Sequence, residues 1–544
     1  MDIYVLILVV ILYLGITVYL AWLGYKHTRS ANDYYTAGGE VNPFLMAMGY
    51  GAAFISTSAI VGFGGAAAVY GLSLLWLTVF NIIVGIFISF VWIGRRTRAM
   101  GRELSAQTFP ELLGTRYNSP FIRKFSAILI AVAMPLYAAA VMIAGARFME
   151  LSLNLNYTFS LLLLGAIVGA YVLAGGMKGV LYTGAFQGTL MLVVMIVLLI
   201  FTYNMMGGVT EAHNSLASLK HLVPDALVMQ GHQGWTAMPE LFSRSWLFVI
   251  TTLVLGVGIG VLAQPQLAVR YMTVRSNKEL YRALVPGGIF ILIMTGVGFT
   301  VGALSNVYFY ESMGTIALRA SVDPATGLAN TDTIIPMFIT NTLPSWVVYV
   351  FMLTLISAAM STLSGQLHAI ATSVSYDLYQ TETTSAQTGL KLARYGTVVG
   401  LIVTIILSYI LPVSIVAIAT AMFFGLCASG FLPVYIFGLF WKKVTTVGAK
   451  AGMIVGTSIY ILSMLFMYTS MTSIFGLSRL IFGQDSIVTF PFNYIDPIVY
   501  ALPISLVVTV IVSLATQSSL DLQHVNKCFA FMDEKRPSSI KLDK

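Results

Sequence analysis

Residues 49–71 read GYGAAFISTSAIVGFGGAAAVYG, and residues 256–272 read GVGIGVLAQPQLAVRYM. Each stretch lies in a long apolar run, and each contains several residues that interrupt a helix. Glycine weakens a helix by roughly 1 kcal/mol, and proline removes a backbone donor. Within a membrane, interrupted backbone is tolerated only where it lines a cavity or is buried in protein. The two stretches therefore predict two broken transmembrane helices, unless their glycines serve only close helix packing.

The composition supports a membrane protein. Of the 544 residues, 58% are hydrophobic and only 9% are charged, against about 25% charged in an ordinary soluble domain. The apolar runs predict an all-α polytopic protein with about 13 transmembrane helices. A β-barrel is not indicated, because its strands would alternate apolar and polar residues. The predicted spans are 3–25, 44–71, 72–94, 126–149, 158–181, 186–206, 246–271, 283–308, 345–375, 392–412, 413–441, 447–469 and 497–515.

Lysine and arginine predict the orientation. If the N-terminus lies outside, the inside loops and tail hold 24 of the 29 basic residues, including a group from Arg270 to Arg282. Such an excess is typical of cytoplasmic loops, which face anionic lipids. We therefore expect the N-terminus outside and the C-terminus inside, with no nucleic acid needed to explain the net charge of +8.

Chemistry-bearing groups are sparse within the spans. The acidic residues all fall in loops or at helix ends, which argues against a proton pump or a polyamine carrier. The sequence contains no phosphate-binding loop, hydrolase motif or metal-ligand spacing, so an enzyme is not indicated. The polar groups within the spans are neutral hydroxyls, amides and helix ends, which suit a dehydrated Na⁺ as coupling ion and an anionic or neutral organic solute. The lipid bilayer is the other predicted partner, and no organic cofactor is indicated. The sequence does not indicate the oligomeric state.

The two broken helices lie five spans apart, so they cross the membrane in opposite directions. Interrupted segments at corresponding positions of two inverted halves indicate a midplane binding site in a secondary transporter. In span 345–375, Ala358, Ser361 and Thr362 follow the spacing i, i+3 and i+4 on one helical face. On spacing alone, these hydroxyls fit helix packing better than an ion site.

Six motifs in order then resemble the solute:sodium symporter family. They are NDYYTAGGEV (32–41), TFPELLGTRY (108–117), GGMKGVLYTGAFQG (175–188), AQPQLAVRYM (263–272), AAMSTLSGQL (358–367) and FWKKVTTVGAKAG (440–452). The resemblance, over about residues 30–455, implies a LeuT-type core of two inverted five-helix repeats. It also implies a sodium site made by Ala52, Ile55, Ala358, Ser361 and Thr362.

Three positions differ from relatives in that family. Phe54 stands where the proline carrier has an acidic residue, and Gly184 stands where an aspartate is common on the ion's exit path. Ala59 replaces a glutamine of the sugar carrier. These differences count against proline and a hexose as the solute and leave the sodium exit route open.

The resulting prediction is a sodium-coupled symporter of the cell membrane that imports a short monocarboxylate. An amino-acid symporter is the alternative, and a transport-like sensor is a rival from another class. The solute site is predicted at Ser56, Thr57, Ser58, Gln264 and Gln266. The predicted units are an N-terminal helix and loop (1–43), a first repeat (44–206), an extracellular loop (207–245), a second repeat (246–441), two further helices (442–520) and a cytoplasmic tail (521–544).

Overall fold

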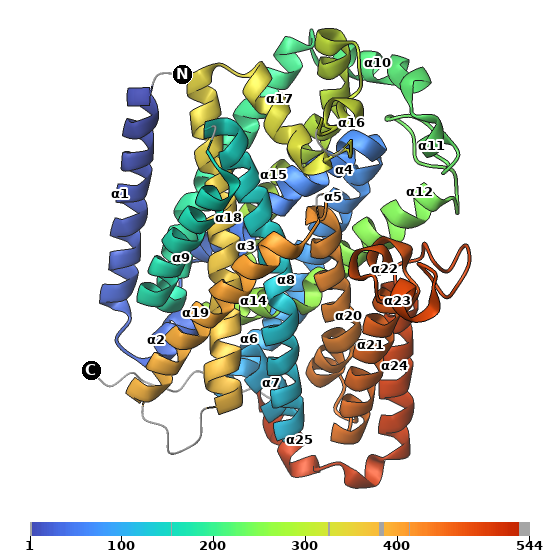
Figure 1. Cartoon of the computed structure of the whole chain (residues 1–544). Helices are drawn as coiled ribbons and strands as arrows, with labels where there is room; N and C mark the ends of the chain where they lie inside the picture. Colours follow the sequence, from blue (N-terminus) through green and yellow to red (C-terminus); the bar gives the residue numbers. More distant parts are fainter. Residues whose placement is uncertain (1–2, 154, 325–326, 380–385, 413, 533–544) are drawn as a thin grey trace.

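The computed structural model describes residues 3–532, apart from 154, 325–326, 380–385 and 413. Within these residues the chain is helical, with only two isolated β-bridges, Val41 with Val274 and Val322 with Ala329. The long helices form a single bundle (Figure 1). They are α1 (Ile3–His27), α8 (Pro120–Leu153), α9 (Tyr157–Met205), α15 (Asn277–Met313), α18 (Ser345–Thr372), α19 (Ala386–Ile410), α20 (Val416–Phe440), α21 (Thr446–Phe466) and α24 (Ile498–Ala515).

Eleven helices of the described chain are long and apolar enough to cross a membrane, and two shorter apolar helices cover Pro43–Phe54 and Tyr157–Ala170. The prediction of an all-helical membrane protein is confirmed, while the count of 13 spans remains a prediction. The remaining segments of the core are α3 (Pro43–Phe54), η2 (Ser58–Gly62), α4 (Phe63–Tyr70), η3 (Gly71–Leu74), α5 (Leu75–Ile82), η4 (Ile83–Gly94), η6 (Phe248–Val257), α13 (Gly258–Gly260), η7 (Val261–Ala263), α14 (Pro265–Ala268), η8 (Val269–Thr273) and η10 (Ser373–Tyr379).

Most of the other short helices lie at the two ends of the bundle. At one end are α10 (Val209–Ser218), η5 (Leu219–Leu222), α11 (Asp225–Val228), α16 (Ala317–Ala320), η9 (Thr331–Thr333) and α17 (Ile334–Thr342). At the other are α2 (Ala31–Thr36), η1 (Ala37–Gly39), α6 (Arg95–Glu103), α7 (Phe109–Arg116), η11 (Gln517–Ser519), α25 (Leu522–Cys528) and η12 (Ala530–Met532). Nearer the middle of the view are α12 (Arg244–Leu247), which packs against η6, and α22 (Thr469–Phe475) and α23 (Leu477–Phe482), which pack against α21.

One predicted helix boundary was wrong. The sequence predicted two spans, 158–181 and 186–206, whereas α9 runs from Tyr157 to Met205 with a kink at Gly176. Gly176 has φ 52° and ψ −152°, a conformation that residues with a Cβ rarely adopt. Because the chain is apolar on both sides of this kink, hydropathy places the boundary several residues too late.

The broken helix α3 lies in the centre of the bundle, packed against α9, α15 and α18. Two glycines allow this close approach. A Cβ on Gly49 would lie 2.8 Å from a methyl carbon of Leu181, and one on Gly51 would lie 2.4 Å from the ring of Phe290. The helix α1 packs on the outside of α9 and leaves much of its surface exposed, as expected for a helix that faces lipid (Figure 1).

Candidate functional site

The first predicted break occurs at residues 55–57. The helix α3 ends at Phe54, and Ile55 takes an extended conformation with φ −91° and ψ 99°. The chain becomes helical again at Ser58, where η2 leads into α4. Because a helix end leaves backbone carbonyls without partners in the next turn, this break offers oxygen atoms deep inside the protein.

Side chains of α18 contact the last turn of α3. The hydroxyl of Ser361 donates to the carbonyl of Ala52 at 2.8 Å, and the hydroxyl of Thr362 donates to the same carbonyl at 3.2 Å. Ser361 also lies 3.1 Å from the carbonyl of Ala358. These four residues are 2% exposed or less. The structure thus brings together four of the five residues predicted to hold sodium.

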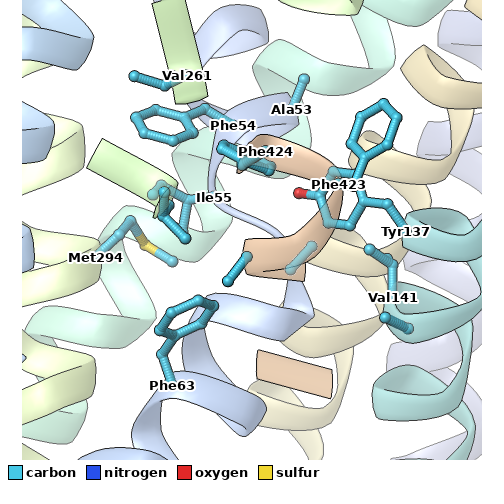
Figure 2. Packing of buried hydrophobic residues seen from close by; sticks show 14 of the residues in the cluster. Ala53, Phe54, Ile55, Phe63, Tyr137, Val141, Val261, Met294, Phe423 and Phe424 are labelled. Atoms are coloured by element: carbon cyan, nitrogen blue, oxygen red, sulfur yellow. The ribbon is translucent and has the colours of Figure 1, made fainter. Parts of the chain in front are cut away.

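The fifth residue, Ile55, lies at the break itself and is 1% exposed. It lines a small cavity of about 20 Å³ between the break and α20. Figure 2 shows Ile55 and Phe54 beside Phe424, with Tyr137 of α8 on the other side of that ring. Ile55 therefore directly follows the turn of α3 that the hydroxyls of α18 contact, and it also lines this cavity.

The predicted solute residues are not all at this cavity. Ser56 lines it, whereas the hydroxyl of Thr57 donates to the carbonyl of Val141 in α8 at 2.9 Å. The backbone N–H of Ser58 donates to Ser56 Oγ at 3.1 Å, and Ser58 Oγ itself is buried without a hydrogen-bond partner in the described chain. The hydroxyls of residues 56–58 therefore point in different directions.

The cavity has polar lining residues that sequence reasoning missed. They are Asn81, Tyr137, Thr295 and Thr420. The Oδ1 atom of Asn81 is buried and has no hydrogen-bond partner within the described chain, so it is available to a bound molecule. The signal in the sequence was a single amide within the apolar run LWLTVFNIIV (75–84).

The second predicted break lies at Gln264. This residue has φ −72° and ψ 116°, and Pro265 begins the short helix α14. The side-chain amide of Gln264 donates to the carbonyl of Gly260 at 3.2 Å, and Gln266 donates to Gln264 Oε1 at 3.2 Å. Gln266 lines a second small cavity of about 20 Å³, nearer α7.

Arg270 lies at this second cavity and not in a loop, which corrects its assignment to the loop group Arg270 to Arg282. It is 1% exposed, and its Nη1 donates to the carbonyl of Gly49 at 2.6 Å. A Cβ on Gly365 would lie 3.2 Å from Arg270 Nη2, so the glycine leaves room for the guanidinium. The arginine therefore joins the two broken helices and lies beside Gly365, which is one helical turn after Ser361 in α18.

The outer half of the first broken helix is held by the segment 207–245 and by α15. Trp235 Nε1 and Asn306 Nδ2 each donate to the carbonyl of Ala68 at 2.8 Å. His232 Nε2 lies 2.8 Å from the carbonyl of Val69. The segment 207–245 therefore covers and fixes the end of α4.

Comparisons with known proteins agree with this arrangement. The model of the sodium:solute symporter family matches residues 34–456. The sodium/pantothenate symporter of Haemophilus influenzae is 29% identical over 84% of this chain and 90% of its own length. The high-affinity proline transporter PutP of Bacillus subtilis is 29% identical over 81% of this chain and 89% of its own.

Solved structures show the same fold. A Na⁺-coupled sialic acid symporter superposes with a TM-score of 0.73 at 18% identity, covering 94% of this chain and 97% of its own. Mhp1, a nucleobase-cation-symport-1 family transporter, superposes with a TM-score of 0.50 at 14% identity, covering 92% and 98%. These neighbours are LeuT-fold transporters, in agreement with the predicted fold.

Proposed function

Because the chain belongs to the sodium:solute symporter family, we propose that it uses a sodium gradient to import a small organic solute by alternating access. The family and the similar curated proteins are transporters and not enzymes. In this proposal the chain lies in the cell membrane with 13 spans, its N-terminus outside and its C-terminus inside. Residues 44–206 and 246–441 form the two inverted repeats.

The proposed sodium site consists of the carbonyls of Ala52, Ile55 and Ala358 and the hydroxyls of Ser361 and Thr362. The observation that supports it most is the donation of both hydroxyls to the single carbonyl of Ala52 at the end of a broken helix. Sodium binds hard oxygen ligands, and no charged group is required. On binding, each hydroxyl would turn its proton away and present a lone pair to the ion.

Ile55 explains how sodium would be coupled to the solute. Its backbone belongs to the proposed ion shell, and the residue also lines the neighbouring cavity. An ion that fixes the break at Ile55 therefore also shapes the cavity wall. Two ligands that favour the same conformation strengthen each other's binding by typically 1–3 kcal/mol.

We place the solute in the cavity beside Ser56, with Thr57, Ser58, Gln264 and Gln266 near its path, and propose a short monocarboxylate. No charged side chain lines the cavity among the described residues, and the N-terminal end of the outer half-helix begins at Ser58. Such an end attracts a negative charge without a salt bridge. Pantothenate, proline and sialic acid, which the similar proteins are named for, each carry a carboxylate.

A zwitterionic amino acid is the second candidate, since proline transporters are among the similar proteins. Asn81 Oδ1 is an unpartnered acceptor at the cavity and would accept a hydrogen bond from an ammonium group. Replacement of Asn81 by Ala should then weaken binding of an amino acid, while a monocarboxylate without an amine should be less affected.

The test is uptake by proteoliposomes that contain the purified chain. A panel of labelled monocarboxylates and amino acids is offered with and without an inward sodium gradient. We expect concentrative uptake of one class only when the gradient is present. Uptake that is the same with and without sodium would contradict the proposal. If uptake does depend on sodium, the Asn81→Ala variant distinguishes the solute classes, because it should weaken binding of an amino acid more than binding of a monocarboxylate.

A further inference from the structure

Four arginines of one short helix surround an open groove far from the proposed transport site. The helix α6 contributes Arg95, Arg96, Arg98 and Arg102 to a groove of about 820 Å³, which Glu103 also lines. This helix lies at the end of the bundle that also carries α7 and α25 (Figure 1). In the proposed orientation, which rests on the distribution of basic residues, that end faces the cytoplasm. The groove therefore concentrates positive charge on one side of the membrane.

Neutral acceptors hold the arginines in place. Arg98 Nε donates to Asn277 Oδ1 at 2.9 Å, and Arg102 Nη1 donates to the carbonyl of Arg275 at 2.8 Å. Within the described chain, neither Arg98 nor Arg102 forms an ion pair with a carboxylate. A guanidinium has five donors, so both retain donors and a full positive charge for an anion.

The groove also borders on surface that faces lipid. Three large apolar residues of η4 are about half exposed: Ile83 at 50%, Phe87 at 51% and Trp92 at 57%. The π-helical turns of η4 place residues four or five apart on one side, so these three form a stripe. The stripe ends at Trp92, which lines the groove, and tryptophan is enriched at the membrane interface.

A second aromatic residue lines the groove in addition to Trp92. Phe440, at the end of α20, is 40% exposed and lines the groove, and the guanidinium of Arg96 lies 4.2 Å from the centre of its ring. Arg96 Nη1 also donates to the carbonyl of Leu439 at 2.9 Å. The groove thus joins the end of η4 to the end of α20, and a molecule bound there would contact both.

We propose that this groove binds an anionic phospholipid of the cytoplasmic leaflet. Its phosphodiester would lie among Arg95, Arg98 and Arg102, and an acyl chain would follow the stripe through Phe87 and Ile83. A basic cluster beside exposed apolar helix surface matches both parts of such a molecule. Free phosphate would match the charge but would leave the apolar stripe unused.

Fluorescence of Trp92 provides a direct test. The full-length chain and a Trp92→Phe variant are placed in phosphatidylcholine nanodiscs, and the difference between them gives the emission of Trp92. Brominated phosphatidylglycerol, which quenches tryptophan on contact, is then increased stepwise and compared with brominated phosphatidylcholine. We expect quenching by the anionic lipid to saturate at a low mole fraction, and quenching by the neutral lipid to rise only in proportion to its amount.

Matched variants separate a site from general surface charge. Arg95→Gln with Arg102→Gln removes two exposed groove arginines, and Arg282→Gln with Arg394→Gln removes two exposed arginines elsewhere. Each arginine near an anionic surface raises the binding affinity roughly fivefold. Loss of two arginines in the groove variant should therefore raise the half-saturating mole fraction of the lipid about 30-fold. The control variant should change it much less.

Three outcomes would overturn the proposal. These are equal quenching by the two lipids, equal loss in the two double variants, and displacement of the lipid by millimolar inorganic phosphate. The last result would show that the groove takes a free anion. Thermal unfolding of each variant in phosphatidylcholine alone checks that the changes have not disturbed the fold.

Discussion

Removal of the hydroxyl from Ser361 or Thr362 should raise the sodium concentration needed for half-maximal uptake. Each substitution deletes one oxygen from a proposed shell of about five. An interaction of a neutral group with a charge contributes roughly 1.5–3 kcal/mol, and a lost ligand in a buried site is poorly replaced. Ser361→Ala and Thr362→Val should therefore each raise the half-saturating sodium concentration by about ten- to a hundredfold.

Three comparisons make this prediction specific. Thr362→Ser keeps the hydroxyl, so its sodium affinity should stay near that of the parent. Ser364 is the matched control because its hydroxyl donates to the carbonyl of Ser361 in its own helix, at 2.9 Å, and not to α3. Solute affinity at saturating sodium should change much less in Ser361→Ala than its sodium affinity, because mass action restores the bound ion.

The assay is initial uptake in proteoliposomes as a function of external sodium. Thermal unfolding without sodium shows the separate cost of losing the hydrogen bond to Ala52, which should be about 1 kcal/mol. If Ser364→Ala loses as much sodium affinity as Ser361→Ala, the hydroxyls serve helix packing and the assigned site is wrong.

The remaining predictions concern an ion path, a loop and the topology. Gly184→Asp should fold and alter the transport rate with a modest change in sodium affinity, since a Cβ there would lie an ordinary 3.6 Å from Gly49 Cα; loss of expression would mean that the glycine is needed for packing. Burial lowers the pKa of His232 from its ordinary 6.5, although its bond to the Val69 carbonyl opposes this. Because the unfolded chain then binds more protons, stabilisation by His232 is complete above pH 6.5 and falls as the pH drops towards the folded-state pKa, so protease cleavage of loop 207–245 should increase in acid. The same increase in His232→Gln would contradict this role. A tag at the N-terminus should be accessible from outside and one after Lys544 should not; accessibility of both on one side would refute 13 spans.

The two broken helices could be predicted from the sequence because their cause is local. The glycines of residues 49–71 and Pro265 weaken a helix whatever its neighbours are. The structure interrupts one helix after Phe54 and the other just before Pro265. The face of α18 with Ser361 and Thr362 could also be predicted, since helical spacing alone places these residues together. The contact of that face with Ala52, about 310 positions earlier in the chain, was implied only by family resemblance.

Other features depend on contacts that spacing does not encode. Hydropathy treats Arg270 as a loop residue, because nothing nearby in the sequence shows that Gly49 supplies an acceptor and Gly365 supplies space. Likewise, the hydroxyl of Thr57 contacts α8 because of how the helices pack. Asn81 lines the cavity for the same reason. In the sequence, its isolation in an apolar run is the only sign that it could be a site residue.

The coupling ion is the central claim, and driven accumulation tests it most directly. Proteoliposomes with an inward sodium gradient and no proton gradient are given the transported solute at equal concentrations on both sides. We expect the solute to accumulate inside, and a sodium ionophore to abolish this accumulation while a protonophore does not. Accumulation that a proton gradient drives in the absence of sodium would contradict the account and would leave the oxygen cluster of Ala52, Ser361 and Thr362 without its proposed ion.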